Sequence, residues 1–380
     1  IQFTHAAGDD YHLLSGSPAI DRGKSFTYPG LLYDMQDSLR NNGATFDIGA
    51  LEFGSQGLVK ACDCAITIDS ATQYVNGNNY AYQAGDTICI ESGTRDFLHF
   101  RNFAGTAEQP LIFVNMGGNV VIDHDGNKPG LKFANVQHAV IRGDGMSQYL
   151  QGIVIQRSAQ GNGLVVNGNV ENVLIEQIEV TGVKRHGILV RGTNQTGVQV
   201  KDVVIKRNYI HDIDGTGILV QTSGNRHKQV HGGNPDSLKQ IHNAAICFNE
   251  ITATGMTAIK VVGLGEKILV ASNELDQYGT GNQRGRDRGI EIHRGVWNSN
   301  VYGNTLTYGG GTGIFLKGAG SNKIYNNLVV EPGRTNPSTR ANRSYHGIQA
   351  KDMETSTVQN THILNNTIVS PAANGILMTN

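Results

Sequence analysis

The heptapeptide HGILVRG at residues 186–192 returns in altered form along most of the chain, as in TGILVQT (216–222) and RGIEIHR (288–294). Every copy has Gly or Ala in its second position and apolar residues in its third and fifth positions. This alternation is typical of a short β-strand. The nine copies are PGLKFAN (129–135), NGLVVNG (162–168), HGILVRG (186–192), TGILVQT (216–222), TAIKVVG (257–263), RGIEIHR (288–294), TGIFLKG (312–318), HGIQAKD (346–352) and NGILMTN (374–380).

The spacing of the copies predicts a solenoid. Successive copies lie 24 to 41 residues apart, which indicates one coil of fixed size that carries loop insertions. A second register supports it, because an Asn precedes an aliphatic residue by two positions at Asn208, Asn249, Asn273, Asn304, Asn327 and Asn366. Stacked Asn amides satisfy buried polar groups at a turn. We therefore predict an all-β fold, a right-handed parallel β-helix whose coils bury their apolar faces by stacking.

Composition excludes several classes of protein. With 31 Lys and Arg against 32 Asp and Glu, the chain lacks the basic surplus on which a nucleic-acid binder of high global charge relies. No run of 18 apolar residues is present to cross a bilayer. The 49 glycines and the charged fraction of only 17% favour an all-β protein. We expect neither nucleic acid nor membrane insertion.

The four cysteines predict one local disulfide. Cys62, Cys64 and Cys89 lie close together in the sequence, and we expect Cys89 to pair with Cys62 or Cys64. Cys247, within an apolar run, is expected to be a small buried residue. Burial of all four as free thiols is the alternative.

Two segments resemble known β-helix proteins. AGDTICIESG and GTAEQPLIFVN, within residues 60–125, resemble the opening coils of secreted bacterial β-helix proteins, including polysaccharide lyases of the alginate lyase and chondroitinase B kind. YHLLSGSPAIDRG and FDIGALEFG, within residues 1–55, resemble the closing segment of other bacterial β-helix domains. The resemblance implies that residues 1–55 are the tail of a preceding β-helix domain or a cap. Residues 56–380 then form this β-helix, as part of a larger multidomain chain.

Alternation also places candidate site residues on one face. Equivalent residues of successive coils stack about 4.8 Å apart, and the first, fourth and sixth positions of each copy should point outward. Between the fifth and eighth copies these positions become rich in charge. The candidates are Lys260, Arg288, Glu291, His293, Arg294, Lys317, His346 and Lys351, with Tyr345 beside them. A solvated face that happens to be charged is the alternative.

Loop insertions predict a groove around this face. Residues 222–241 follow their strand, whereas 279–287 and 331–345 precede theirs, so the loops should rise on opposite sides. The segments 222–241, 279–294 and 331–351 carry net charges of +2, +2 and +3 on a chain whose total is −1. A basic groove on an otherwise acidic protein predicts an anionic partner. For an extracellular β-helix that partner is an anionic, uronate-containing polysaccharide.

The residue types favour elimination over hydrolysis. Glycoside hydrolysis uses a pair of carboxylates, and the columns supply only Glu291. Lyase or C5-epimerase chemistry instead needs cations that neutralise a uronate carboxylate and a base that removes the adjacent proton. We assign His293 as the base, with Arg294, Lys260 and Glu291 also in the catalytic group. Arg288, Lys317, His346, Lys351 and Tyr345 are assigned to substrate binding, with Tyr345 or His346 as proton donor.

The stretch RGIEIHRGVWNSNVYGNTL (288–306) resembles the catalytic coil of chondroitinase-B-type lyases. That family has Arg-His-Gly after an outward strand, whereas this chain has His293-Arg294-Gly295. Val262 stands where the family places its Lys base, and Lys260 is the nearest Lys. The acidic pair that binds calcium in the family is not evident, so no metal ligand is assigned.

Other candidates and a second function remain open. Asp123-His124-Asp125 has some calcium potential, His227 and His231 have the spacing of metal ligands, and Tyr278 or Trp297 can stack on sugars. No cofactor is expected, with calcium the one option. The alternative to a secreted polysaccharide lyase is a non-catalytic β-helix module of a large cell-surface protein or adhesin, where carbohydrate binding or a spacer role is expected.

Overall fold

The computed structural model describes residues 3–5, 10–13, 16–23, 47–48, 63–143, 151–192, 199–222, 240–263, 265–281, 286–293, 296–317, 321–334, 345–351 and 361–379. The chain divides into two compact units, Ile1–Asp63 and Cys64–Asn380.

The first unit contains a short antiparallel pair, β1 (Phe3–His5) and β2 (Asp10–Leu13). Its two sequence motifs meet, because the backbone N–H of Asp21 donates to Asp47 Oδ1 at 2.6 Å and that of Ile48 donates to the carbonyl of Ala19 at 2.9 Å. Ala19 and Asp47 are buried. The SPAID segment (17–21) and residues 47–48 therefore form one local structure, and the role of residues 1–55 stays a prediction.

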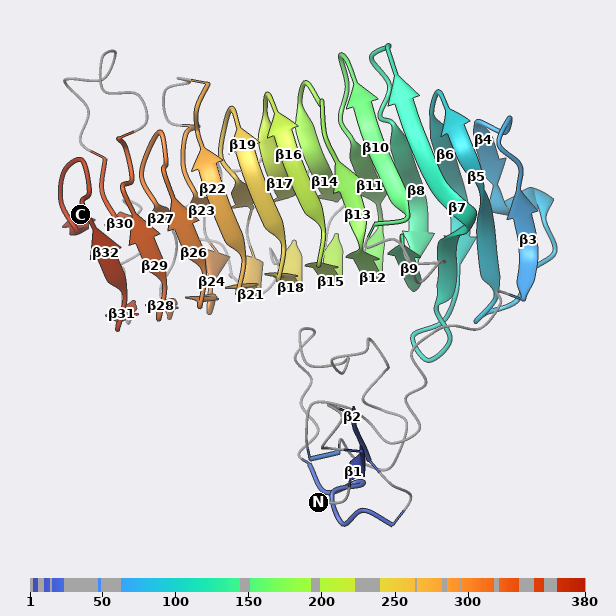
Figure 1. The fold of residues 1–380 in the computed structure, drawn as a ribbon, viewed down its shortest axis with the longest axis horizontal. Helices are drawn as coiled ribbons and strands as arrows, with labels where there is room; N and C mark the ends of the chain where they lie inside the picture. The colour runs from blue at the N-terminus through green and yellow to red at the C-terminus, as the bar shows by residue number, and fades with distance from the viewer. Residues whose placement is uncertain are drawn as a thin grey trace. The chain divides into compact units, whose positions relative to one another are not determined.

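The second unit is the predicted right-handed parallel β-helix. Every strand pair described in this unit is parallel, and the strands stack side by side along one axis from β3 to β33 (Figure 1). Each regular coil contributes one strand to each of three stacks. A single 3-10 turn, Gly77–Asn79, interrupts the first coil.

The first stack contains β3 (Cys64–Ile68), β5 (Thr87–Arg95), β7 (Leu111–His124), β9 (Ala139–Arg142), β12 (Val170–Glu176), β15 (Val200–Lys206), β18 (Ile241–Cys247), β21 (Gly265–Ala271), β24 (Val296–Trp297), β25 (Asn300–Tyr302), β28 (Lys323–Tyr325) and β31 (His362–Leu364). The ends of β5 and β7 continue into the second stack, with β10 (Ile153–Ser158), β13 (Ile178–Val180), β16 (Tyr209–Ile213), β19 (Glu250–Thr254), β22 (Glu274–Tyr278), β26 (Thr305–Thr307), β29 (Leu328–Val330) and β32 (Thr367–Val369).

The third stack is an 11-stranded sheet that contains all nine sequence copies. Its strands are β4 (Tyr74–Asn76), β6 (Leu98–Ala104), β8 (Leu131–Gln137), β11 (Leu164–Gly168), β14 (His186–Gly192), β17 (Thr216–Gln221), β20 (Ile259–Val262), β23 (Ile290–His293), β27 (Ile314–Lys317), β30 (Ile348–Lys351) and β33 (Ile376–Thr379).

Strand pairing in the third stack follows the predicted register throughout. Ile188 pairs with Leu164 on one side and with Ile218 on the other, and the third and fifth positions face the core. The second-position glycine is a packing requirement, because a Cβ on Gly187 would lie 2.7 Å from the carbonyl oxygen of Gly217 and 2.8 Å from Cγ2 of Ile210. A Cβ at Gly187 would require its neighbours to shift, whereas Ala258 is accommodated at the equivalent position of the fifth copy.

The Asn ladder occupies the corner between the first and second stacks. Each ladder Asn follows a residue with positive φ, such as Arg207 (53°) or Ser272 (53°), so the chain turns sharply there. Asn273 Nδ2 donates to Asn304 Oδ1 at 2.9 Å, and the same oxygen accepts from the Asn273 backbone N–H at 3.0 Å. The same pattern runs from Asn208 to Asn366.

Cys64 and Cys89 form a disulfide between β3 and β5, with a Cα–Cα distance of 5.6 Å. This confirms the predicted pairing of Cys89 with one of its two neighbours. Cys247 is free and buried, and burial raises its pKa to about 11. No helix in the described parts of the chain has the length and apolarity needed to traverse a bilayer.

Candidate functional site

The predicted charged face lies on β20, β23, β27 and β30. Lys260, Glu291, Phe315 and Gln349 form one column across these strands. Val262, His293, Lys317 and Lys351 form the next column. Strand alternation directs both columns away from the core, so side chains from different coils meet on one surface.

Glu291 is the centre of this surface. Its side chain is only 2% exposed, and it accepts two cations: Lys260 Nζ lies 3.0 Å from Oε2 and Arg288 Nη1 lies 2.9 Å from Oε1. His293 Nδ1 lies 3.8 Å from the same Oε1. A buried carboxylate needs such partners, because an unpaired charge would be expensive to bury. Glu291 therefore fixes three groups that remain partly exposed. We call Lys260, Arg288, Glu291 and His293 the Glu291 cluster.

Phe315 forms an aromatic floor beside the cluster. The guanidinium carbon of Arg288 lies 3.5 Å from the centre of its ring, which is a cation–π contact. The His293 ring centre lies 6.2 Å from that of Phe315. Arg288 is thus held from two sides, by a carboxylate and by a ring.

Two further cations extend the positive surface. Lys317 pairs in register with His293, and Lys351 pairs with Lys317 on the next strand. Neither Lys317 nor Lys351 forms an ion pair with any residue that the structure describes. Both lysines add positive charge to this surface.

Two residues assigned to substrate binding, Tyr345 and His346, are buried rather than outward. His346 is in the first position of its copy, which is buried in four of the nine copies. Tyr345 and His346 are buried at 8% and 3% exposure. The Tyr345 hydroxyl donates to Asp287 Oδ2 at 2.9 Å, and His346 Nδ1 accepts from the backbone N–H of Asn374 at 3.2 Å. Burial lowers the pKa of His346. Since this position adjoins the preceding corner, neighbouring coils cover it.

Several predicted features fall outside the described residues. Arg294 is one of them, and so is most of the three predicted groove loops, 222–241, 279–287 and 331–345. His227 and His231 lie in the same undescribed part. These assignments stay predictions.

His186 is a neighbour of the cluster that sequence reasoning left unused. It begins β14, and its Nδ1 is buried with no hydrogen-bond partner among the described residues. Burial, reinforced by the charges of Arg185, Lys260 and Arg286, lowers its pKa to about 4. A neutral histidine therefore lies within electrostatic reach of Lys260. His186 is the first residue of the third sequence copy, two copies before the one that contains Lys260. That position could have identified it from the sequence.

His186 predicts an acid-sensitive fold. Its folded pKa of about 4 lies below the ordinary value of 6.5, so the unfolded chain takes up the proton first as the pH falls. The contribution of His186 to stability should be complete above pH 6.5 and should be lost progressively between pH 6.5 and 4. The full loss is on the order of 3 kcal/mol. Urea unfolding at several pH values measures it.

The control for this measurement is His186→Gln, which removes the titrating group. Its free energy of unfolding should vary less with pH across the same window, whereas His362→Gln, at an exposed position on β31, should behave like the parent protein. An unchanged slope in His186→Gln would contradict the assignment.

A second polar region, not anticipated from sequence, lies at the other end of the third stack. A hollow there is lined by Tyr74, His99, Arg101 and Lys132, among others. His99 and Arg101 alternate within β6 as outward residues. Extending the outward columns by two coils, back beyond Pro129, would have revealed them.

Three weaker candidates have structural roles. Asp123 and Asp125 both bind Arg157, with Arg157 Nη1 2.7 Å from Asp125 Oδ1. Tyr278 was predicted as a sugar-stacking residue, which is wrong, because its ring is fully buried in the core. Trp297 Nε1 donates to Glu266 Oε2 at 3.2 Å, on the first stack. Within the described ranges, no group of three or more His, Cys, Asp or Glu side chains is arranged to hold a metal ion.

Comparison with known proteins identifies no family. No family model matches the sequence, and no curated protein sequence matches it. Among solved structures, the enzymatically active domain of bacteriophage CBA120 tailspike protein 2 is 8% identical over 80% of this chain and 38% of its own, with a TM-score of 0.45. Alginate lyase from Paenibacillus sp. is 13% identical over 80% of this chain and 98% of its own, with a TM-score of 0.41.

Pectate lyase Pel9A is 11% identical over 79% of each chain, with a TM-score of 0.43. The chain spans 38%, 62% and 56% of three phage or viral proteins it resembles: the CBA120 tailspike, the Dettilon tailspike and ORF18 of Geobacillus virus E2. At these identities the likeness is one of fold alone and assigns no chemistry.

Proposed function

We propose that the protein is a polysaccharide lyase that cleaves an anionic, uronate-containing polymer by β-elimination at the Glu291 cluster. The observation that supports this most is a partly exposed His293 beside a buried, doubly ion-paired Glu291, with Lys317 and Lys351 on the next two strands making no ion pair with a described residue. A base next to fixed positive charge is what removal of a proton adjacent to a uronate carboxylate requires.

The proposed reaction starts with the substrate carboxylate. Lys317, Lys351 and the exposed edge of Arg288 neutralise it, which lowers the free energy of the carbanion that forms. The Glu291 carboxylate favours the His293 tautomer with its proton on Nδ1, so the Nε2 lone pair is the base. In this proposal Glu291 and Lys260 are positioning residues. Their pairing keeps Arg288 and His293 in place.

Bond changes balance within the substrate. His293 Nε2 takes the proton on C5, the C5–H electrons form the C4–C5 double bond, and the C4–O bond breaks. The departing oxygen takes the proton that Nε2 has gained. The products are a chain with a new hydroxyl end and a chain with a 4,5-unsaturated uronate. The proposal assigns no cofactor to this step.

The Cys64–Cys89 disulfide supports an extracellular setting, because disulfides persist in oxidising compartments. We propose that the protein is secreted or displayed at a cell surface, where uronate polymers are met.

Polymers of mannuronate, guluronate, galacturonate and glucuronate test the proposal directly. We expect the ultraviolet absorbance of the unsaturated uronate to rise with at least one polymer, and no product from neutral polymers such as cellulose derivatives. A parallel reaction in D2O distinguishes the epimerase alternative, in which deuterium enters at C5 without any new absorbance. Binding of a uronate polymer with neither change would contradict the proposal and favour a carbohydrate-binding surface module.

A further inference from the structure

The hollow on the third stack lies on the same face as the Glu291 cluster. Tyr74, His99 and Lys132 are paired in register across β4, β6 and β8, in the column that later contains Lys260. Arg101 belongs to the neighbouring column, which later contains His293. The hollow and the Glu291 cluster therefore lie at two places along the same outward columns of the third stack.

Charge in the hollow is one-sided. Arg101 and Lys132 line it, and neither makes an ion pair with a described residue. None of the residues that line the hollow is Asp or Glu. Two cations with no carboxylate beside them in the lining create a positive electrostatic potential, which favours binding of an anion.

Tyr74 supplies a fixed aromatic surface. Tyr74 is 62% exposed, and its hydroxyl accepts from Lys128 Nζ at 2.9 Å. Lys128 in turn lies 4.1 Å from the centre of the Phe97 ring, which meets Tyr74 edge-on at 5.2 Å. His99 also meets the Tyr74 ring, at 5.6 Å between ring centres. An exposed ring held by these contacts and at its hydroxyl offers an aromatic surface to the apolar face of a sugar.

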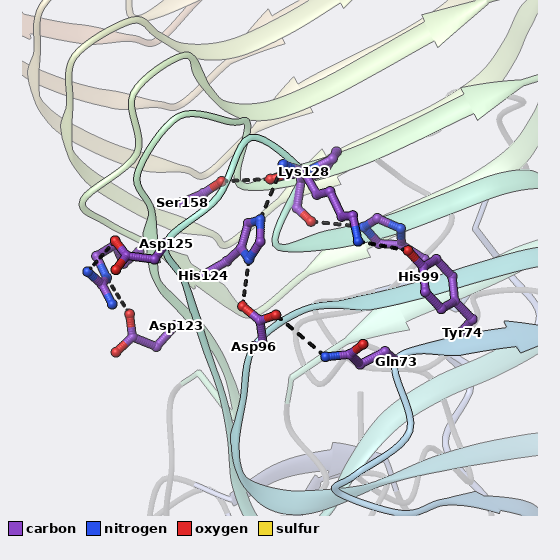
Figure 2. A network of polar contacts seen from close by, with 11 residues as sticks. Gln73, Tyr74, Asp96, His99, Asp123, His124, Asp125, Lys128 and Ser158 are labelled. Carbon is purple, nitrogen blue, oxygen red and sulfur yellow. Dashed lines mark hydrogen bonds and ion pairs between the residues drawn. The ribbon is translucent and has the colours of Figure 1, made fainter.

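A chain of hydrogen bonds supports this arrangement (Figure 2). His124 Nδ1 donates to Asp96 Oδ1 at 2.6 Å, and His124 Nε2 accepts from the backbone N–H of Lys128 at 3.2 Å. The hydroxyl of Ser158 donates to the Lys128 carbonyl at 3.1 Å. Side-chain hydrogen bonds from His124 and Ser158 therefore fix the turn that places Lys128 beside Tyr74.

His99 completes the polar lining. Its Nε2 donates to the carbonyl of Pro129 at 2.9 Å. Burial is the main cause that lowers the pKa of His99, and the nearby Lys132 and Lys128 lower it further. The ring is therefore neutral near pH 7, and Nδ1 is left as an acceptor for a hydroxyl group.

We propose that this hollow is a second carbohydrate site, which binds an acidic saccharide unit with its carboxylate at Arg101 and Lys132 and its ring on Tyr74. The choice of a uronate over another anion rests on the proposed function of the Glu291 cluster. Binding itself depends only on the hollow.

The two sites are spaced for one polymer. From β6 to β20 there are five strand steps, or about 24 Å at the usual spacing between strands. Val165, Leu189 and Leu219 lie between them in the same column, where they pack together and are buried at 5–6% exposure. A saccharide chain of several units that runs along this face is long enough to reach both sites, whereas a disaccharide reaches one.

Calorimetric titration of His293→Ala with uronate hexamers tests the proposal without turnover. The probes are hexamers of mannuronate, guluronate and galacturonate, with cellohexaose as the neutral comparison. We expect at least one acidic hexamer to bind, and Arg101→Gln with Lys132→Gln to weaken it at least tenfold. Tyr74→Ala should also weaken it. Lys323→Gln, an exposed lysine of the first stack, is the matched control and should bind like the parent.

Equal affinity of the double variant and its parent, or no preference for any acidic hexamer over cellohexaose, would overturn the proposal. In the active protein, Arg101→Gln with Lys132→Gln should raise KM for long polymers and leave the turnover of disaccharide-sized substrates unchanged. Binding at the hollow by a protein without lyase activity would refute the proposed function and leave the second site standing.

Discussion

His293→Ala should lower kcat for uronate elimination by a factor of about 10³ and change KM little. A general base contributes roughly 10²–10⁴ to such reactions, and the cations that bind the substrate carboxylate stay in place. Because the His293 side chain is 19% exposed and points away from the core, its removal should leave the unfolding temperature within a degree or two of the parent. Initial rates from the product absorbance, with a thermal melt of the same preparation, measure both effects.

The matched control is His362→Ala, an exposed histidine on β31 of the first stack. It removes the same group from a surface that has no part in the proposed reaction, so the rate should not change. A His293→Ala protein with parental kcat would place the base elsewhere. His293→Gln refines the test, since glutamine preserves hydrogen bonding but cannot take up a proton, and it should be as inactive as alanine.

Asn273→Ala should lower the free energy of unfolding by about 3–5 kcal/mol, the largest stability effect that we expect for a polar residue. Asn273 is fully buried, and its Oδ1 accepts from both the backbone N–H and Nδ2 of Asn249, each at 3.0 Å. Its Nδ2 also donates to the carbonyl of Ile246 at 2.9 Å. Each buried group left without a partner costs about 1–3 kcal/mol. Urea unfolding measures the change.

Asn366→Ala provides the comparison, because this ladder residue is in the final coil and only half-buried. Its free energy of unfolding should fall by only about 1–2 kcal/mol, which is less than the fall expected for Asn273→Ala. Equal losses at the two positions would mean that the amide ladder is not the source of the effect. Asn273→Asp should be at least as harmful as alanine, since the carboxylate keeps an acceptor but brings a second oxygen close to the Ile246 carbonyl.

Periodicity was sufficient to predict strand register because one rule repeats in every coil. The third and fifth positions must be apolar and the second must be small, so nine imperfect copies align themselves. Lys260, Glu291 and Phe315 share a column for this reason. The Asn ladder was predictable for the same reason. Each ladder Asn bonds to the Asn of the next coil, so the residue must recur at the same position of every coil.

Side-chain partners were not predictable in the same way. Outward direction was taken to mean exposure, yet Glu291 is buried because Lys260 and Arg288 close over it. Tyr278 was misplaced because a tyrosine at a strand end can turn either way. It fills space above Gly309, where a Cβ would lie 2.0 Å from its ring. Such choices depend on neighbours in the same and adjacent coils, which the repeat pattern does not specify.

The hollow was missed for another reason. Its strands, β4 and β6, lack the repeated heptapeptide, and β6 contains the bulky LHFRNFA sequence instead. Phe100, Phe113 and Phe133 fill these coils with stacked and edge-on rings, at centroid distances of 4.9 to 5.0 Å. In these coils aromatic residues occupy core positions that are aliphatic in the later coils, so the repeat pattern is harder to detect in the sequence.

The third-stack strands keep one register although the chain between them varies from 24 to 41 residues per coil. Length changes are absorbed at the corners, since a longer loop costs little extra closure entropy. Whole loops around this face can therefore be exchanged without disturbing any column, whereas a one-residue insertion inside a strand would shift the outward residues of that strand against its neighbours. Loop length and strand register can in this way vary separately, and grafting corner loops from one coil to another is a practical route to new surfaces on this scaffold.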